Sequence, residues 1–172
     1  MNTSTLSQTE ISELEDIHKK LIPKRKKQFQ TYSILNFKKT KTRDAASFIV
    51  NKSVAILKQN GISNFNKNKF YIEFHKRNSG FEKKDFGNWF IWHEDDNAAV
   101  NYLCYTVIFC LRKDHTLKGG NLLYKLNGKE CVQTIKTGDI LQFKGNIEHC
   151  PEPVTGFGCR DIIVVFIKRT KE

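Results

Sequence analysis

Two segments near the start of the chain repeat their apolar residues at the spacing of an amphipathic helix. The first follows the capping-box pattern Ser7-Gln8-Thr9-Glu10 and is interrupted at Pro23. The second begins after Asp44, a favoured N-cap residue type, and stops at Asn60-Gly61. Their apolar positions are Ile11, Leu14, Ile17 and Leu21, and then Ala45, Phe48, Ile49, Ala55, Ile56 and Leu57. We therefore expect two helices that pack an apolar face on the rest of the protein.

After residue 66 the period of the apolar positions changes to two, which indicates β-strands. Residues 70–75 alternate apolar and polar side chains, as in a strand with one buried face. Asn127-Gly128 is a strong hairpin signal, and Gly119-Gly120 and Thr137-Gly138-Asp139 indicate further turns. The other expected strands cover 32–37, 89–93, 103–111, 121–126, 130–135, 140–143 and 161–168.

Helices followed by many short strands predict an α+β protein. We expect a double-stranded β-helix, or jelly roll, with the N-terminal helices packed on one sheet. The 172 residues suit a single domain, with a helical N-terminal part at 1–66 and the jelly-roll core at 67–172.

The net charge of +11 at pH 7 is concentrated near the N-terminus. From residue 17 to residue 43 the chain has ten lysines and arginines and no acidic residue. Such a segment can follow a phosphate backbone, which makes nucleic acid a candidate partner through basic residues 19–43. A solvated surface of a lysine-rich protein explains the same charge equally well.

The remaining composition excludes several classes of protein. No apolar run approaches the length of a membrane helix, and residues 1–9 lack the apolar core of a signal peptide. We therefore expect an intracellular protein without a membrane partner, cytoplasmic, or nuclear if it is eukaryotic or viral. The five cysteines are odd in number and lack zinc-ligand spacing, which indicates free buried thiols. The sequence predicts no oligomeric state.

Residues that could bind a metal come directly after the apolar stretch 90–92. On an extended strand, His93 and Asp95 share a face and present an imidazole nitrogen beside a carboxylate oxygen. Two histidines and one carboxylate suit Fe(II), and His149, just after the expected strand 140–143, is the candidate third ligand. Taken singly, each residue also has an ordinary structural explanation, as a turn residue or a loop histidine.

A basic residue completes this set. Arg160 precedes the last expected strand, where a guanidinium facing the same cavity would bind one carboxylate of a diacid co-substrate. His75 and His115 have no comparable partners in the sequence, so we assign them structural roles.

In this order the residues resemble the 2-oxoglutarate- and Fe(II)-dependent dioxygenases, most closely the prolyl 4-hydroxylase-like branch. The resemblance spans residues 70–168. The segments that carry it are His93-Glu94-Asp95, residues 104–111 with Gly119-Gly120, residues 138–143, and residues 149–156 with Arg160.

The resemblance implies an enzyme that hydroxylates a substrate C–H bond and releases succinate and CO2. Fe(II) would be held by His93, Asp95 and His149. The co-substrate 2-oxoglutarate would chelate the metal and place its far carboxylate on Arg160, with O2 as oxidant and ascorbate as a reductant. A protein or peptide is the expected substrate, as in prolyl hydroxylases.

Two departures from the family pattern concern the co-substrate. Where relatives carry a tyrosine that hydrogen-bonds 2-oxoglutarate, this chain has Cys110, so Tyr102, Thr106 or Tyr124 would have to supply the hydroxyl. Arg160 also lies one residue later than the commonest spacing, an excess that residues 156–158 can absorb.

Two alternative functions stay open at this level. A nucleic-acid-modifying oxygenase fits the basic segment, although such enzymes carry a second arginine where this chain has Phe166. A non-catalytic, cupin-like jelly roll would bind metal without turning over 2-oxoglutarate.

Overall fold

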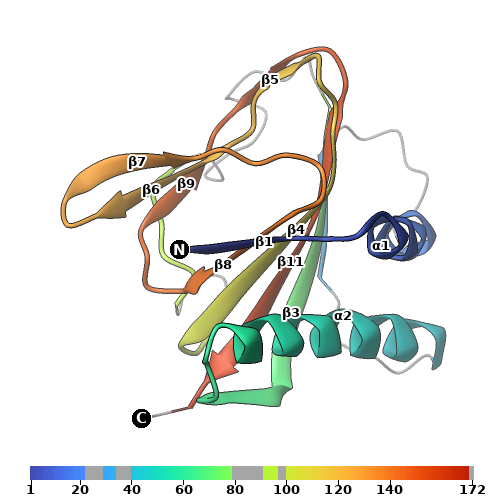
Figure 1. The fold of residues 1–172 in the computed structure, drawn as a ribbon, viewed down its shortest axis with the longest axis vertical. Coiled ribbons are helices and arrows are strands. Elements are labelled where there is room, and N and C mark those ends of the chain that lie inside the picture. The colour runs from blue at the N-terminus through green and yellow to red at the C-terminus, as the bar shows by residue number, and fades with distance from the viewer. Residues whose placement is uncertain (22–28, 34–39, 79–90, 97–99, 171–172) are drawn as a thin grey trace.

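The computed structural model describes residues 1–21, 29–33, 40–78, 91–96 and 100–170, which form antiparallel sheets and two helices (Figure 1). The elements in chain order are β1 (Asn2–Thr5), α1 (Gln8–Leu21), β2 (Phe29–Ser33), α2 (Thr40–Gln59), β3 (Phe65–Asn78), β4 (Cys104–Lys113), β5 (Leu117–Gly119), β6 (Leu122–Leu126), β7 (Lys129–Gln133), β8 (Asp139–Lys144), β9 (His149–Pro151), β10 (Val154–Gly156) and β11 (Cys159–Arg169).

The largest sheet in the described part of the chain has the strand order β1-β8-β4-β11-β3-β2, and all its pairs are antiparallel. A three-stranded sheet, β7-β6-β9, and a two-stranded sheet, β10-β5, complete the β-structure. In Figure 1 the helices lie on one side of the large sheet, and β6, β7 and β9 lie on the other. The prediction of an α+β protein with two N-terminal helices is confirmed, and its sheets are antiparallel.

Alternate residues of the large sheet face two separate apolar cores. Val107, Phe109 and Ile163 pack with Leu14 of α1 and Ile49 of α2. On the opposite face, side chains of the large sheet form a second core with Leu122 of β6. These side chains are Ile108, Leu141, Phe143, Ile162, Val164 and Phe166. Both faces of β4 and β11 are therefore buried, which explains why these strands are almost wholly apolar.

The capping box predicted for the first helix is confirmed. The Ser7 backbone N–H donates to Glu10 Oε2 at 2.7 Å, and the Glu10 N–H donates to Ser7 Oγ at 3.3 Å. The prediction of Asp44 as the N-cap of the second helix is wrong, because α2 begins at Thr40. The apolar stripe that marks the packed face starts only at Ala46, so the sequence pattern revealed the buried part of the helix and missed its polar first turn.

The predicted ends and turns depend on glycine. Gly61 follows α2 at φ +74°, and the Ile62 N–H donates to the Leu57 carbonyl at 2.9 Å, so the helix ends in a left-handed cap as predicted. Asn127 and Gly128 have φ values of 51° and 75° and join β6 to β7, which confirms the hairpin.

Some N-terminal expectations need correction. The part at 1–66 is not only helical, because β1 and β2 pair with β8 and β3 in the large sheet. The polar, exposed β1 is held by backbone pairing, which leaves no apolar period for the sequence to reveal. Of the strand expected at 32–37, residues 34–37 lie outside the described part, as do residues 89 and 90 of the strand expected at 89–93. None of the helices in the described ranges is both long and apolar enough to cross a membrane.

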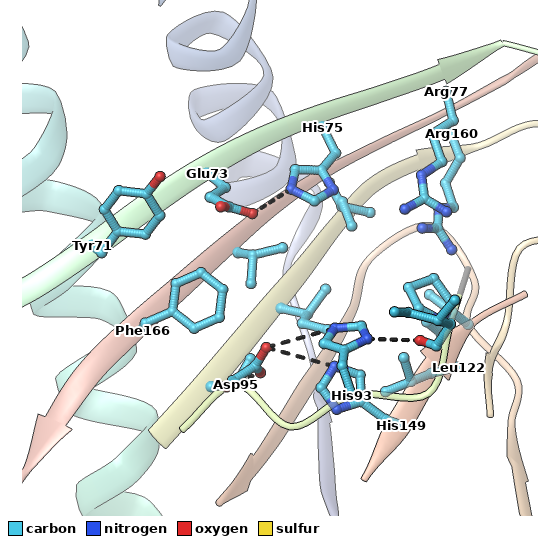
Figure 2. Close-up of a pocket in the computed structure, with 17 residues that line it drawn as sticks. Tyr71, Glu73, His75, Arg77, His93, Asp95, Leu122, His149, Arg160 and Phe166 are labelled. Atoms are coloured by element: carbon cyan, nitrogen blue, oxygen red, sulfur yellow. Dashed lines mark hydrogen bonds and ion pairs between the residues drawn. The ribbon is translucent and has the colours of Figure 1, made fainter. Parts of the chain in front are cut away.

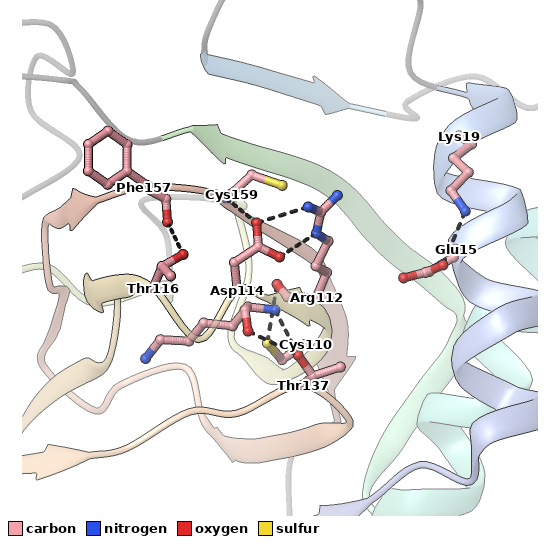
Figure 3. A network of polar contacts seen from close by, with 10 residues as sticks. Glu15, Lys19, Cys110, Arg112, Asp114, Thr116, Thr137, Phe157 and Cys159 are labelled. Carbon is pink, nitrogen blue, oxygen red and sulfur yellow. Dashed lines mark hydrogen bonds and ion pairs between the residues drawn. The ribbon is translucent and has the colours of Figure 1, made fainter.

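A polar network fixes the start of β11 (Figure 3). Asp114 accepts hydrogen bonds from Arg112 Nε at 2.7 Å and from the Cys159 backbone N–H at 2.8 Å. Close by, the Thr116 hydroxyl donates to the Phe157 carbonyl at 2.7 Å. These contacts hold the chain immediately before Arg160 and thereby set the direction of its side chain.

Candidate metal centre

Three side chains from two distant parts of the sequence meet on the face of the large sheet that is opposite the helices. The ligand atoms of His93, Asp95 and His149 lie within 4.8 Å of one another. Asp95 Oδ1 is 3.9 Å from His93 Nε2 and 3.7 Å from His149 Nε2 (Figure 2). The grouping supplies two imidazole nitrogens and one carboxylate oxygen, a set suited to Fe(II) with open coordination positions.

Backbone pairing brings the two histidines together. His93 and His149 exchange both backbone hydrogen bonds at 2.9 Å, as an isolated antiparallel bridge, and their ring centroids are 4.4 Å apart. We expected the pair His93 and Asp95 to end a regular strand. Residues 91–96 instead run irregularly, and the bridge to β9 does the positioning.

Hydrogen bonds select the imidazole tautomer that can bind a metal. His93 Nδ1 lies 2.8 Å from the carbonyl of Ile91, and His149 Nδ1 lies 2.9 Å from that of Ile147. A carbonyl only accepts, so each Nδ1 carries the proton and each Nε2 keeps its lone pair. Both free lone pairs belong to the nitrogens nearest Asp95. This arrangement fits the backbone-anchored histidine ligands of metal sites.

Asp95 is oriented by a hydroxyl from the large sheet. Thr106 Oγ1 on β4 donates to Asp95 Oδ2 at 2.6 Å, which leaves Oδ1 facing the two imidazoles. Burial raises the pKa of Asp95 and lowers the pKa of His149, while their mutual attraction opposes both shifts. A cation between them would favour the carboxylate and release its proton.

Gly145 holds the loop that carries Asp95. Its carbonyl accepts the backbone N–H groups of Asp95 at 2.7 Å and Asp96 at 3.1 Å, and its own N–H donates to the Cys104 carbonyl at 2.9 Å. Asp96 in turn accepts from the Cys104 N–H at 2.7 Å and from the Arg169 guanidinium. A Cβ at position 145 would lie 2.3 Å from Asp96 Oδ1, so only glycine permits this approach. No motif in the sequence predicts this role of Gly145.

The three candidate ligands line a cavity of about 590 Å³ between the large sheet and the strands β6 and β9. Arg160 also lines it and is 2% exposed; its guanidinium donates to the Gly120 carbonyl on the β5–β6 connection. Much of the remaining wall is apolar, formed by Ile91, Ile108, Leu122, Ile135, Pro151, Ile162, Val164 and Phe166. The apolar wall limits water near the three ligands.

Of the residues considered as hydrogen-bond donors to the co-substrate, only Thr106 is among the described residues that line the cavity. Thr106 lines the cavity, but its hydroxyl is already bound to Asp95. Cys110, Tyr102 and Tyr124 are not among the lining residues. The Cys110 thiol is directed to the carbonyl of Arg112, at 3.8 Å. Their roles toward a co-substrate therefore stay predictions.

The polar face of β3 supplies cavity residues that the sequence pattern did not predict. The alternation at 70–75 predicts a half-buried strand, and the sequence predicts only a structural role for His75. The cavity is lined from this strand by Tyr71, Glu73, His75 and Arg77. His75 Nε2 lies 2.7 Å from Glu73 Oε2, and burial, followed by Glu73, raises the pKa of Tyr71 to about 12. The sequence signal for these residues is the alternation of period two, which continues to Arg77.

Solved structures of oxygenases are similar to almost the whole chain. A member of the 2OG-Fe(II) oxygenase family from Burkholderia pseudomallei has a TM-score of 0.70 at 13% identity, covering 97% of this chain and 84% of its own. The chain has the fold of a 2OG-Fe(II) oxygenase. The viral collagen prolyl hydroxylase of Paramecium Bursaria Chlorella virus-1, solved as its 2OG complex, has a TM-score of 0.62 at 17% identity, covering 99% and 96%.

A prolyl hydroxylase from Trichoplax adhaerens, in complex with a hypoxia inducible factor peptide fragment, is similar as well. Its TM-score is 0.60 at 13% identity, with 98% of this chain and 83% of that chain covered. No protein-family model matches the sequence, and no curated protein matches it. At these identities the likeness establishes the fold alone.

Proposed function

We propose that this protein is a 2-oxoglutarate- and Fe(II)-dependent dioxygenase that hydroxylates a side chain of a protein or peptide. The observation that carries the proposal is the convergence of His93, Asp95 and His149, whose ligand atoms lie within 4.8 Å of one another while both Nδ1 atoms are bound to backbone carbonyls. The fold supports it. We interpret the facing sheets as a double-stranded β-helix, and residues 1–172 as one domain.

Each part of the site has a task in this chemistry. Bound Fe(II), with O2 and 2-oxoglutarate, would supply the oxidising power that yields succinate, CO2 and a hydroxylated product. The two imidazoles and Asp95 would hold the metal on one side, with Thr106 keeping the carboxylate turned toward it. Arg160 would bind the far carboxylate of 2-oxoglutarate.

A protein or peptide substrate is favoured by one similar structure, the Trichoplax prolyl hydroxylase solved with a peptide fragment. The nucleic-acid alternative depends on the basic residues 19–43. The side chains of residues 21–42 lie outside the described part of the chain. No described feature favours nucleic acid over a peptide.

The proposal is tested by metal binding and turnover in the same protein. Anaerobic titration with Mn(II) is expected to show one site in the wild type, lost in Asp95→Ala and His149→Ala. Succinate formation from 2-oxoglutarate, with Fe(II), ascorbate and air, is expected to require the same residues. His115→Ala, an exposed histidine, serves as the matched control and should behave as wild type.

The substrate class follows from additions to this assay. Proline-containing peptides should raise succinate formation and gain the mass of one oxygen atom, whereas oligonucleotides should do neither. Succinate formation that rises only with oligonucleotides would instead indicate a nucleic-acid substrate. Tight, Asp95-dependent metal binding with no succinate above the Asp95→Ala background would identify a binding jelly roll instead.

A further inference from the structure

Asn121, on the connection between β5 and β6, is hydrogen-bonded to three separate segments of the chain. Its side-chain oxygen accepts from Lys113 Nζ on β4 at 2.9 Å and from the Ile135 backbone N–H at 3.4 Å. Its amide nitrogen donates to Glu152 Oε2 on the β9–β10 connection at 2.7 Å, and the Glu152 N–H donates to the Asn121 carbonyl at 2.9 Å. Neither Asn121 nor Glu152 is among the described residues that line the cavity, so any effect on a ligand has to pass through another residue.

The peptide group between Gly120 and Asn121 is held at both ends. Its N–H, that of Asn121, donates to Glu152 Oε2 at 3.2 Å. Its carbonyl, that of Gly120, accepts a hydrogen bond from the Arg160 guanidinium. Because a trans peptide group is planar, its N–H and its carbonyl point in opposite directions. The bond to Glu152 therefore fixes the direction of the carbonyl that meets Arg160.

Two glycines make this anchor necessary. Gly119 and Gly120 have φ values of 73° and 69°, in the left-handed region that glycine enters freely. Such a backbone has little preference of its own for one orientation of the Gly120 carbonyl. A larger residue could not stiffen it, because a Cβ at Gly120 would lie 2.9 Å from Val154 Cγ1 and 3.4 Å from Arg160 Cδ. The rigidity has to come from the side chains that hold the peptide group.

Arg160 is the residue that a fixed carbonyl would orient. It is 2% exposed, and its side chain extends from β11 toward Leu122, the residue after Asn121 (Figure 2). An arginine side chain has several rotatable bonds, whereas it binds a carboxylate through two parallel hydrogen bonds only when the guanidinium plane is correctly oriented. Arg160 Nε has no hydrogen-bond partner in the described part of the chain. The bond to the Gly120 carbonyl is thus a contact that orients the guanidinium from within the protein.

We infer that Asn121 and Glu152 are positioning residues for co-substrate binding, which aim the Arg160 guanidinium at the far carboxylate of 2-oxoglutarate by holding the Gly120 carbonyl. The inference rests on the proposed function for the identity of the ligand. The contacts run from the Glu152 carboxylate through one peptide group to Arg160, and each hydrogen bond in such a chain polarises the next. Loss of Glu152 should therefore weaken the far-carboxylate end of the site and leave the metal end unchanged.

The decisive experiment compares two ligands by anaerobic calorimetry on the Mn(II)-loaded protein. The ligands are 2-oxoglutarate and 2-oxopentanoate, which keeps the chelating end and the chain length but has no far carboxylate. Glu152→Ala is expected to weaken 2-oxoglutarate binding roughly five- to tenfold and to leave 2-oxopentanoate and Mn(II) within about twofold. Glu10→Ala is the matched control, because Glu10 also accepts a backbone N–H and pairs with a lysine, but at the start of α1. It should bind both ligands as the wild type does.

Reversing the side-chain hydrogen bond separates positioning from a general loosening of the fold. Asn121→Asp places a carboxylate against that of Glu152 and should weaken 2-oxoglutarate binding as Glu152→Ala does. The double variant Asn121→Asp/Glu152→Gln restores one donor and one acceptor, and should recover most of the lost affinity, to within about threefold of the wild type. In turnover, each single variant should raise the KM for 2-oxoglutarate and keep kcat within about twofold.

Two results overturn the inference. One is equal 2-oxoglutarate affinity in Glu152→Ala and Glu10→Ala, and the other is equal weakening of the two 2-oxoacids in Glu152→Ala. Should Glu152→Ala not fold, the double variant decides: recovery of the affinity lost in Asn121→Asp supports the inference, and no recovery overturns it.

A metal-free measurement distinguishes failure of this inference from failure of the proposed function. Glutarate should raise the Tm of the metal-free wild type, and should raise that of Glu152→Ala by less. A protein that shows this difference but forms no succinate would retain the positioning residues and lose the oxygenase function. A protein that forms succinate with the same KM for 2-oxoglutarate in wild type and Glu152→Ala would do the reverse.

Discussion

Replacing Gly145 by alanine is the sharpest test of how the fold builds the metal centre. The added Cβ would lie 2.3 Å from Asp96 Oδ1 and 2.5 Å from Cys104 Sγ. Carbon needs roughly 3.5 Å from such atoms, so something must move by about 1 Å. The neighbours are held by the Asp96–Arg169 ion pair and by β4, and cannot give way cheaply.

The displacement directly reaches Asp95, the proposed carboxylate ligand of the metal. The Gly145 carbonyl holds the backbone N–H of Asp95, so a shift of about 1 Å at Gly145 exceeds the ±0.2 Å that metal–ligand distances tolerate. We expect a loss of about 1–3 kcal/mol in the free energy of unfolding from overpacking. Mn(II) affinity should fall by about 10–100-fold, as for other changes that disturb the support of a ligand.

The assay is denaturant unfolding combined with anaerobic Mn(II) titration. Gly128→Ala is the matched control, because Gly128 has a φ of +75° but no atom within 4 Å of an added Cβ. This control should lose about 1–2 kcal/mol of stability through backbone strain and keep wild-type Mn(II) affinity. Wild-type Mn(II) affinity in Gly145→Ala would refute the idea that close backbone approach positions Asp95.

Two further predictions concern buried polar groups. Thr106→Val removes the hydrogen-bond donor to Asp95 and should lower Mn(II) affinity about tenfold. Because that donor stabilises the carboxylate, the pH at which Mn(II) binding is half-maximal should also rise in Thr106→Val. An unchanged half-maximal pH would contradict the role of Thr106. Burial lowers the pKa of His18 from 6.5 to about 4, so the folded state resists protonation, and its stability is complete above pH 6.5 and decreases as the pH falls toward 4. In urea unfolding, His18 should contribute up to about 3 kcal/mol of the stability lost across this range, beside the other buried histidines His75 and His149. The loss should therefore be smaller in His18→Phe and unchanged in the exposed control His115→Gln; an unchanged loss in His18→Phe would exclude a contribution of His18.

The sequence alone predicted the elements whose cause is local. The capping box at Ser7, the left-handed end at Gly61 and the hairpin at Asn127-Gly128 depend on neighbouring residues, and all three were confirmed. The alternation within the strands was likewise readable, because side chains on a strand point to opposite faces whatever surrounds them. The resemblance further named the three residues that the fold brings together.

Tertiary structure decided what the alternation could not. A period of two tells which residues of β3 share a face, but not that β6 and β9 enclose a cavity over that face, so Arg77, Glu73 and His75 were missed as cavity residues. The need for glycine at position 145 is equally invisible, since it arises from Asp96, which is far away in the sequence. Even β1 exists only because β8 offers a free edge. Local periodicity records how a chain is patterned, whereas a site depends on which distant surfaces meet, and that is set by the packing of the whole chain.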